Sequence, residues 1–378
     1  MREVHLLPAL IGHLIYGMVT ALALVGVSYD LYRDNGSFGI TRGSLVRGSL
    51  AGLMSGALMT WALNSQLGSP AVSASMMDNS RPTAFATSLV VGLVAGLGYA
   101  VLYPRATNGS GPALIRGMAY GFALWVTMAL TIVPLLDGEG LRWSVEDVQA
   151  NFETFPGYLL VLGSVLSIVY QWLTALSRSL FSDDVVERAQ EGIGTQGLRA
   201  IVRGAVAGLI GGLLFTIVML QIGFLSTVAS LIGQESSVVG FLVHLVVANI
   251  IGVGYGLLFV RQSNDTGSAL GWGVAYGVLW WLTGPLTMLP LLLGDTPRWT
   301  VEAAADAYPA LIGHMAYGLV LGLVFFRLES RHNPWWVTRN EAEAARAQRA
   351  SDQLLGSAPA LWILTIVIAL TIPVLLAP

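Results

Sequence analysis

The sequence predicts an all-α integral membrane protein of about ten transmembrane helices, arranged as two tandem parallel four-helix repeats with one extra helix at each end. Three observations predict this architecture: an apolar composition, a series of long apolar segments, and an internal repeat. The 378-residue chain is 54% hydrophobic and 11% charged, with a mean hydropathy of +0.68, whereas soluble domains carry about 25% charged residues. The chain has no cysteine, which excludes disulfides, thiolate metal ligands and a thiol nucleophile.

Each apolar segment is long enough to cross a bilayer as a helix, which takes about 20 mainly apolar residues. The segments are 6–28, 47–66, 84–103, 113–136, 156–176, 203–224, 238–260, 269–293, 308–326 and 358–377. We expect helices, because lipid leaves unpaired backbone groups without partners and barrel strands would alternate in polarity. Segment 6–28 resembles a signal peptide, but its central phrase recurs at 308–326, so we expect residues 1–30 to stay as an orphan helix.

The charges predict the orientation of these helices. Fifteen of the nineteen arginines lie in alternate loops or at the helix ends that adjoin them, and lysine is absent. These loops are 31–46, 104–112, 177–202, 261–268 and 327–357. The positive-inside rule makes these loops cytoplasmic and places both termini outside. The expected location is the cell membrane of a prokaryotic cell. The last of them is charged and amphipathic, and it predicts an interfacial segment ahead of the C-terminal helix at 358–378.

An internal repeat appears when the chain is shifted by 156 residues, which superimposes 47–146 on 203–302. Glycines, aromatic residues and charges all match at this one offset; examples are Arg47-Gly48 with Arg203-Gly204, Gly96 with Gly252, Tyr99 with Tyr255 and Trp143 with Trp299. The two units are four-helix repeats at 47–176 and 203–326. An even helix count gives both copies the same orientation, related by an axis along the membrane normal. Many of the glycines form GxxxG pairs, which predict close helix packing.

Two further features accompany each repeat. A short acidic helix is expected in the loop before the fourth helix, with Ser144 or Thr300 as its N-cap and an interfacial tryptophan before it. Prolines interrupt the third helix near its outer end, at Pro134 in the first copy and at Pro285 and Pro290 in the second, so we expect a kink there.

One phrase is written twice: PALIGHLIYG at 8–17 and PALIGHMAYG at 309–318. It places His13 and His314 at equivalent positions, and a third intramembrane histidine is His244. Each lies about six residues from the outer end of its helix, which is a depth of about 9 Å. In the aligned first repeat, Ser88 replaces His244 and Val161 replaces His314.

These histidines allow three interpretations. Each imidazole could hydrogen-bond a neighbouring helix and serve packing alone. The three could instead line a path for protons or a small solute, because intramembrane ionisable groups often mark function. They could also bind haem b or a divalent metal. We favour packing among these interpretations. If the histidines form a functional site, its residues are His13, His244 and His314. The predicted membrane segments contain no Asp, Glu or Arg well inside them, which argues against an ion-coupled carrier with an acidic coupling site.

The chain carries no P-loop, HExxH, GxSxG or dinucleotide-binding motif, so we do not expect an enzyme. With its glycine spacing and the phrase IGHMAYG, the unit resembles small four-helix membrane proteins of unknown function from bacteria and archaea, present here as two copies over 47–326. This resemblance implies no activity.

The sequence favours permeation or transport of a small solute or ion between the two repeats. The alternatives are a haem- or metal-binding membrane subunit of a redox complex, and a scaffold that transports nothing. The expected partners are the lipid bilayer and either a second copy of the chain or other subunits of a membrane complex. Nucleic acid is not expected to bind.

Overall fold

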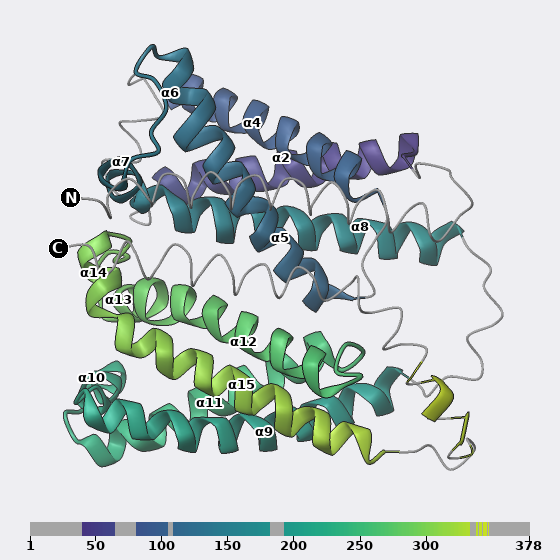
Figure 1. Ribbon diagram of the computed structural model, residues 1–378, viewed down its shortest axis with the longest axis vertical. Helices are drawn as coiled ribbons and strands as arrows, with labels where there is room; N and C mark the ends of the chain where they lie inside the picture. The colour runs from purple at the N-terminus through teal and green to yellow at the C-terminus, as the bar shows by residue number, and fades with distance from the viewer. Residues whose placement is uncertain are drawn as a thin grey trace, which may run out of the picture. The chain divides into compact units, whose positions relative to one another are not determined.

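A computed structural model describes residues 40–64, 81–104, 109–181 and 193–332, with scattered positions from 338 to 347. Their regular secondary structure is helical throughout (Figure 1). The predicted helices at 6–28 and 358–377, and with them His13, lie outside the described residues. The same holds for most of the predicted interfacial segment.

The chain divides into two compact units. Unit 1 comprises Met1–Leu180, Thr296–Ala305 and Thr365–Pro378, and unit 2 comprises Phe181–Asp295 and Asp306–Leu364. The predicted repeat at 47–176 falls within unit 1, and that at 203–326 falls within unit 2 apart from Thr296–Ala305.

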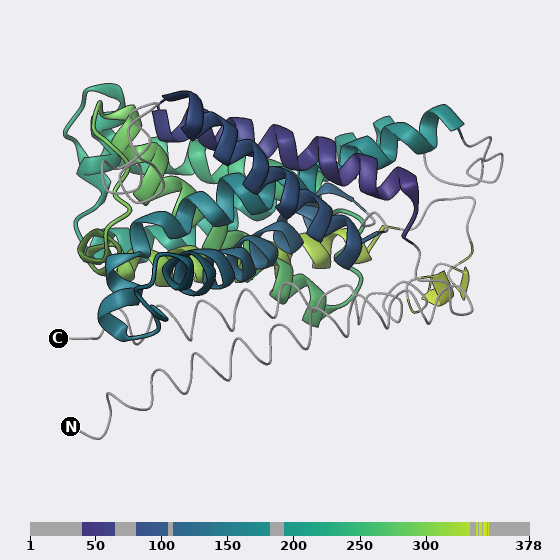
Figure 2. The same cartoon turned by 90° about the horizontal axis from the view of Figure 1, so that it is seen from above.

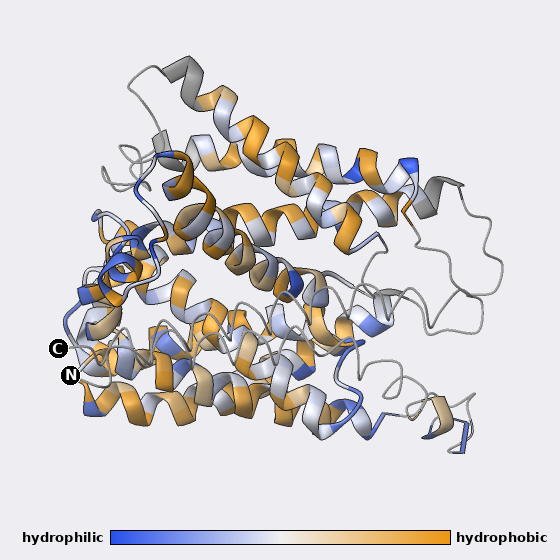
Figure 3. Cartoon of the chain, turned by 45° about the horizontal axis from the view of Figure 1, so that its top comes forward, coloured by the Kyte–Doolittle hydropathy of each residue, from blue (hydrophilic) through white to orange (hydrophobic). Residues whose placement is uncertain are grey.

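Seven helices of the described chain are long and apolar enough to cross a membrane: Phe85–Leu102, Ser110–Leu136, Phe152–Ser177, Gly194–Gln221, Ser237–Phe259, Thr266–Leu292 and Tyr308–Ser330. Figure 3 shows hydrophobic residues along these helices and hydrophilic residues in loops and at helix ends. Several helices also expose a row of large apolar side chains, such as Val238, Leu242, Val246 and Ile250. An exposed apolar face of this length suits lipid and not water. The helices therefore indicate an integral membrane protein.

Unit 1 contains α2 (Arg42–Asn64), α4 (Arg81–Leu102), α5 (Ser110–Leu124), η1 (Trp125–Ile132), α6 (Val133–Leu136), α7 (Val145–Ala150), η2 (Phe152–Thr154), η3 (Gly157–Val165) and α8 (Leu166–Phe181). Helices α2 and α4 run alongside each other (Figure 2). Their glycines meet face to face, because a Cβ at Gly52 would overlap the carbonyl of Gly92, and one at Gly96 would overlap that of Gly48. The predicted span 47–66 corresponds to α2, which is not among the seven apolar helices.

Unit 2 contains α9 (Ile193–Gln221), α10 (Leu225–Ala229), η5 (Ser230–Ile232), α11 (Ser237–Phe259), α12 (Thr266–Thr283), η6 (Gly284–Met288), α13 (Leu289–Leu292) and α15 (Tyr308–Ser330). Gly208 packs against Ala248 and Gly252 to join α9 to α11. Gly273 packs against Gly318 to join α12 to α15. Small residues let these backbones approach closely, as the GxxxG spacing predicts.

The proline interruptions take the form of π-helical turns. In unit 1, η1 ends just before Pro134; in unit 2, η6 contains Pro285 and is followed by Pro290. Proline donates no backbone hydrogen bond and clashes with the carbonyl four residues earlier, and a wider turn relieves both problems. A threonine hydroxyl helps in each case, since Thr131 donates to a carbonyl five residues back at 2.8 Å and Thr287 does the same at 2.7 Å.

The predicted short acidic helices are confirmed. In α7, Ser144 accepts a hydrogen bond from the backbone of Asp147 at 3.1 Å and forms a capping box with it. In the other loop, Thr300 accepts a hydrogen bond from the backbone of Ala303 at 3.2 Å, ahead of α14 (Val301–Asp306).

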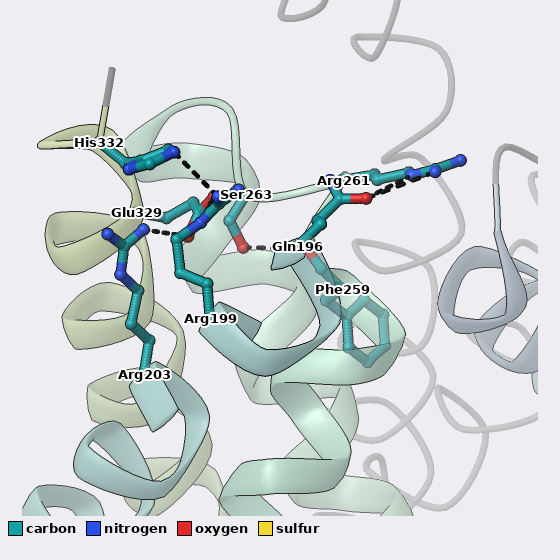
Figure 4. Close-up of polar contacts among 8 residues, drawn as sticks. All are labelled: Gln196, Arg199, Arg203, Phe259, Arg261, Ser263, Glu329 and His332. Atoms are coloured by element: carbon teal, nitrogen blue, oxygen red, sulfur yellow. Dashed lines mark hydrogen bonds and ion pairs between the residues drawn. The ribbon is translucent and has the colours of Figure 1, made fainter. Parts of the chain in front are cut away.

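Several predicted boundaries are wrong. Helix α2 begins at Arg42, inside the predicted loop 31–46, and α8 ends at Phe181, beyond the predicted end at 176. Helix α9 begins at Ile193, inside the predicted loop 177–202, and α15 continues to Ser330, beyond the predicted end at 326. At the ends of α9 and α15, charged residues are paired between the two helices, which favours the longer helices. Glu329 on α15 forms ion pairs with Arg199 and Arg203 on α9, as Figure 4 shows.

Candidate functional site

His244 and His314 line one cavity inside unit 2, with a volume of about 190 Å³. His244 comes from α11 and His314 from α15, and both are at least nine-tenths buried. The rest of the wall comes from α9, α10, η5, α12, η6 and α13. The sequence predicted these two imidazoles at one depth, and the structure brings them to one cavity. The third predicted residue, His13, lies outside the described residues.

Each imidazole uses one ring nitrogen to bond a backbone carbonyl. Nε2 of His244 lies 3.0 Å from the oxygen of Gly212 on α9, and Nδ1 of His314 lies 2.7 Å from the oxygen of Ala310 in its own helix. A carbonyl can only accept, so the bonded nitrogen carries the proton in each ring. In a neutral imidazole the other nitrogen then keeps its lone pair. Separate carbonyl partners are what the packing interpretation predicts for the two histidines. A cavity shared by both imidazoles is not predicted by packing alone.

Phe215 on α9 connects the two histidines. Its ring packs edge-on against both imidazoles, with centroid distances of 5.4 Å to His244 and 4.6 Å to His314. This position depends on Gly313, because a Cβ there would overlap the phenyl ring. The glycine of the Gly-His phrase is therefore required by an aromatic ring from another helix. Phe215 was not predicted as a site residue, because nothing in its local sequence distinguishes it from other apolar residues of α9.

The remaining residues of the phrase at 309–318 fix α15 in place. Pro309 occupies the first turn of the helix, where its missing N–H costs nothing. The hydroxyl of Tyr317 donates to the carbonyl of Ala248 at 2.7 Å, and Gly318 lies against the backbone of Gly273. The phrase is thus a docking sequence that also carries an imidazole into the cavity.

The cavity offers few polar groups. The lone pairs of the two histidines are acceptors, whereas Trp280 lines the cavity with its ring and its indole nitrogen is buried within the protein. Nε2 of His314 is directed toward Gly284 at the start of η6, since a Cβ on that glycine would lie 3.8 Å from it. Almost all other lining atoms are carbon. A pocket of this kind suits a small apolar molecule with one hydrogen-bonding group.

Several lining residues are exposed on the surface of unit 2, and they mark where the cavity meets its surroundings. Ile222, Met288 and Leu292 all line it, and their exposed fractions are 40%, 42% and 66%. Ile222 directly follows α9, Met288 directly precedes α13 and Leu292 is its last residue, all at the opposite end of α9 from the Arg199–Glu329 pair. These three side chains make the exposed edge of the cavity apolar.

A metal site is less complete. Within the described ranges, no group of three or more His, Asp or Glu residues has a geometry that could hold a metal ion. His244 and His314 supply one free nitrogen each, so a metal or haem iron would need further ligands from elsewhere.

Comparisons with known proteins gave no match to a protein-family model, a curated protein or a solved structure. The interpretation of the site therefore depends on its geometry.

The contact between Gly313 and Phe215 gives a direct test of the site's construction. Replacing Gly313 with alanine is expected to lower the free energy of unfolding by about 2 kcal/mol, because the added methyl displaces a buried ring. In a background that already carries Phe215→Leu, the same change should cost less, with a coupling energy of about 1 kcal/mol. Unfolding of the four proteins in mixed micelles measures this cycle. Costs that simply add would mean that the two residues do not touch.

Proposed function

We propose that the chain is a ten-helix protein of a prokaryotic cell membrane, built from two tandem four-helix repeats, and that the second repeat binds a small apolar molecule bearing a hydroxyl or similar hydrogen-bonding group. The observation that carries the binding proposal is that two imidazole acceptors line a cavity whose walls are otherwise apolar. Kinship of each repeat with small four-helix membrane proteins of bacteria and archaea belongs to the same proposal.

Matched contacts inside the two units support the duplication. At the offset of 156 residues, equivalent tyrosines donate to equivalent carbonyls, and equivalent threonines bond within equivalent π-helical turns. The pairs are Tyr120 to Ala95 with Tyr276 to Ile251, and Thr131 to Val126 with Thr287 to Leu282. Hydrogen bonds repeated at one offset are what a duplicated unit predicts, and they support the proposal.

Contacts also revise one alignment between the repeats. The sequence aligns Val161 with His314, but Gly121 lies against the carbonyl of Tyr158 just as Gly277 lies against that of His314. The fourth helix of unit 1 is therefore displaced by about one turn along its neighbour, a shift that accompanies the π-helical segment η3. Tyr158 and Ser88 stand where unit 2 has its histidines, so the imidazole site belongs to the second repeat.

We also propose that a small solute or ion permeates between the two repeats. In that case the cavity in unit 2 is a binding site that a small solute occupies on its way into or across the bilayer. With both termini outside and the arginine-rich loops in the cytoplasm, the cavity would lie in the outer leaflet. Assembly with a second copy or with other membrane subunits is compatible with this proposal.

Binding can be tested with 4-fluorophenol as the probe, followed by ¹⁹F NMR line broadening in micelles. The wild-type chain should broaden the probe signal, and Met288→Trp should abolish the effect because the indole fills the cavity from its exposed edge. Leu291→Trp is the matched control, because Leu291 is similarly exposed but does not line the cavity. Equal broadening by both variants would show that the probe partitions into micelles and does not enter the cavity.

A second candidate function is haem or metal binding, favoured by the two free imidazole nitrogens in one cavity. Purified chain should then show a Soret absorbance or a stoichiometric metal content that His314→Phe removes. A colourless, metal-free protein that binds the probe would leave the apolar ligand as the function.

A further inference from the structure

Unit 1 contains a cluster of four tyrosines at the end where α4 finishes and α5 begins. Tyr99, Tyr103, Tyr120 and Tyr170 are each at most 5% exposed, and their rings pack with neighbouring centroids 5.0 to 6.5 Å apart. Three of the hydroxyls have partners. That of Tyr99 bonds the hydroxyl of Ser167 at 2.9 Å, that of Tyr120 donates to the carbonyl of Ala95 at 2.7 Å, and that of Tyr170 donates to the carbonyl of Pro104 at 2.8 Å. The hydroxyl of Tyr103 is buried and has none among the described residues.

Two arginines flank this cluster. The guanidinium of Arg116 lies 4.8 Å from the ring centre of Tyr103, and that of Arg47 lies 5.7 Å from the ring centre of Tyr170. Tyr99 packs against both Tyr103 and Tyr170, so the two arginines flank one cluster of rings. Nε of each arginine is buried without a hydrogen-bond partner, and no described acidic side chain forms an ion pair with either.

The corresponding end of unit 2 is built differently. Arg203, the equivalent of Arg47, forms an ion pair with Glu329, as Figure 4 shows. At the offset of 156 residues, Trp272 stands in the place of Arg116 and Phe259 in the place of Tyr103. Unit 2 therefore lacks the second arginine and the free hydroxyl, and it supplies a carboxylate of its own. Unit 1 has two arginines, Arg47 and Arg116, and the hydroxyl of Tyr103 at the corresponding positions of its helices.

Half-buried cations without counter-charges are costly, so an anion from outside the described chain would stabilise this cluster. Arg47 lies near the start of α2, Arg116 in the second turn of α5, and Tyr103 directly after α4. These are helix ends, where a membrane helix meets the lipid headgroups, and they belong to the arginine-rich side. Basic pockets between helices on that side are suited to anionic headgroups.

We propose that unit 1 binds the phosphate of an anionic phospholipid from the arginine-rich side of the bilayer. Arg47 and Arg116 supply the charges, and the hydroxyl of Tyr103 donates a hydrogen bond to a phosphate oxygen. Guanidinium groups recognise phosphate through charge-assisted hydrogen bonds, which are about twice as strong as neutral ones. This site is separate from the histidine cavity of unit 2 and does not depend on its function.

The test measures lipid retained by the full chain in native mass spectrometry, after detergent extraction from vesicles of phosphatidylglycerol and phosphatidylcholine. Wild type should retain phosphatidylglycerol preferentially, and the double variant Arg47→Gln/Arg116→Gln should lower that retention about tenfold or more. Tyr103→Phe should lower it about threefold to fivefold, through the loss of one hydrogen bond. Arg261→Gln is the matched control, because it removes an exposed arginine near the same end of unit 2 and should leave retention unchanged.

Two results would overturn the proposal. One is equal retention of phosphatidylglycerol by wild type and the double variant. The other is full displacement of the lipid by millimolar inorganic phosphate, which would identify a free anion as the occupant. If the double variant fails to fold, Tyr103→Phe decides the question, since it copies the phenylalanine of unit 2 and removes a single oxygen. Retention by Tyr103→Phe equal to wild type would then count against the site.

Discussion

Replacing Gly208 with valine is expected to lower the free energy of unfolding by about 3 kcal/mol, the largest effect of any single change proposed for this chain. A Cβ at Gly208 would lie 2.5 Å from the carbonyl oxygen of Ala248 and 2.9 Å from Cα of Gly252. Both are backbone atoms of α11, so the clash can be relieved only by separating α9 from α11. Loss of helix signal on titration with sodium dodecyl sulfate in mixed micelles measures the change.

Gly197→Val is the control for the Gly208 variant. Gly197 lies on the same helix, and a Cβ there has no neighbour within 4 Å. It should change the free energy of unfolding by less than about 0.5 kcal/mol, because valine is no worse than glycine in a helix. Similar losses in both variants would contradict close packing of α9 on α11.

Glu329→Gln is expected to have the second largest effect, a loss of about 2 kcal/mol or more in the free energy of unfolding. Glu329 pairs with Arg199 at 2.9 Å and also with Arg203, and the three side chains are only 13% to 20% exposed. Without the carboxylate, two partly buried cations lie side by side between α9 and α15. The same titration measures the loss.

Glu139→Gln is the control for the Glu329 variant, because its ion pair with Arg142 joins side chains that are 54% and 28% exposed. Exposed pairs contribute about 0–1 kcal/mol, so this variant should unfold almost as the wild type does. Equal effects at the two sites would mean that the Arg199–Arg203–Glu329 cluster is solvated and weak.

The sequence predicted the helical class and most of the helices, because runs of about 20 apolar residues are a strong signal. It missed the true ends of α9 and α15, since Arg199, Arg203 and Glu329 look like loop residues until the other helix supplies their partners. The π-helical turns were also missed. The prolines marked the interruption, but its form depends on which carbonyls the threonine hydroxyls can reach.

The candidate site was predicted in part. His244 and His314 were identified from their rarity in apolar segments, and both line one cavity. Phe215 and Trp280 were not identified, because aromatic residues are common in membrane helices and neither belongs to a motif. The glycine in the Gly-His phrase was the one available signal for Phe215, since a glycine that stands beside the imidazole in both copies of the phrase can indicate close approach of another side chain.

The central claim is that two parallel repeats make up the chain, and cysteine labelling tests it most directly. Because the chain has no cysteine, single cysteines can be introduced without background. Glu139→Cys and Asp295→Cys occupy equivalent positions after the third helix of each repeat, and Ser110→Cys and Thr266→Cys occupy equivalent positions before it. With an impermeant maleimide on intact cells, the account predicts labelling of the first two and protection of the second two until the membrane is opened. Labelling of Glu139→Cys and Asp295→Cys from opposite sides would contradict parallel repeats.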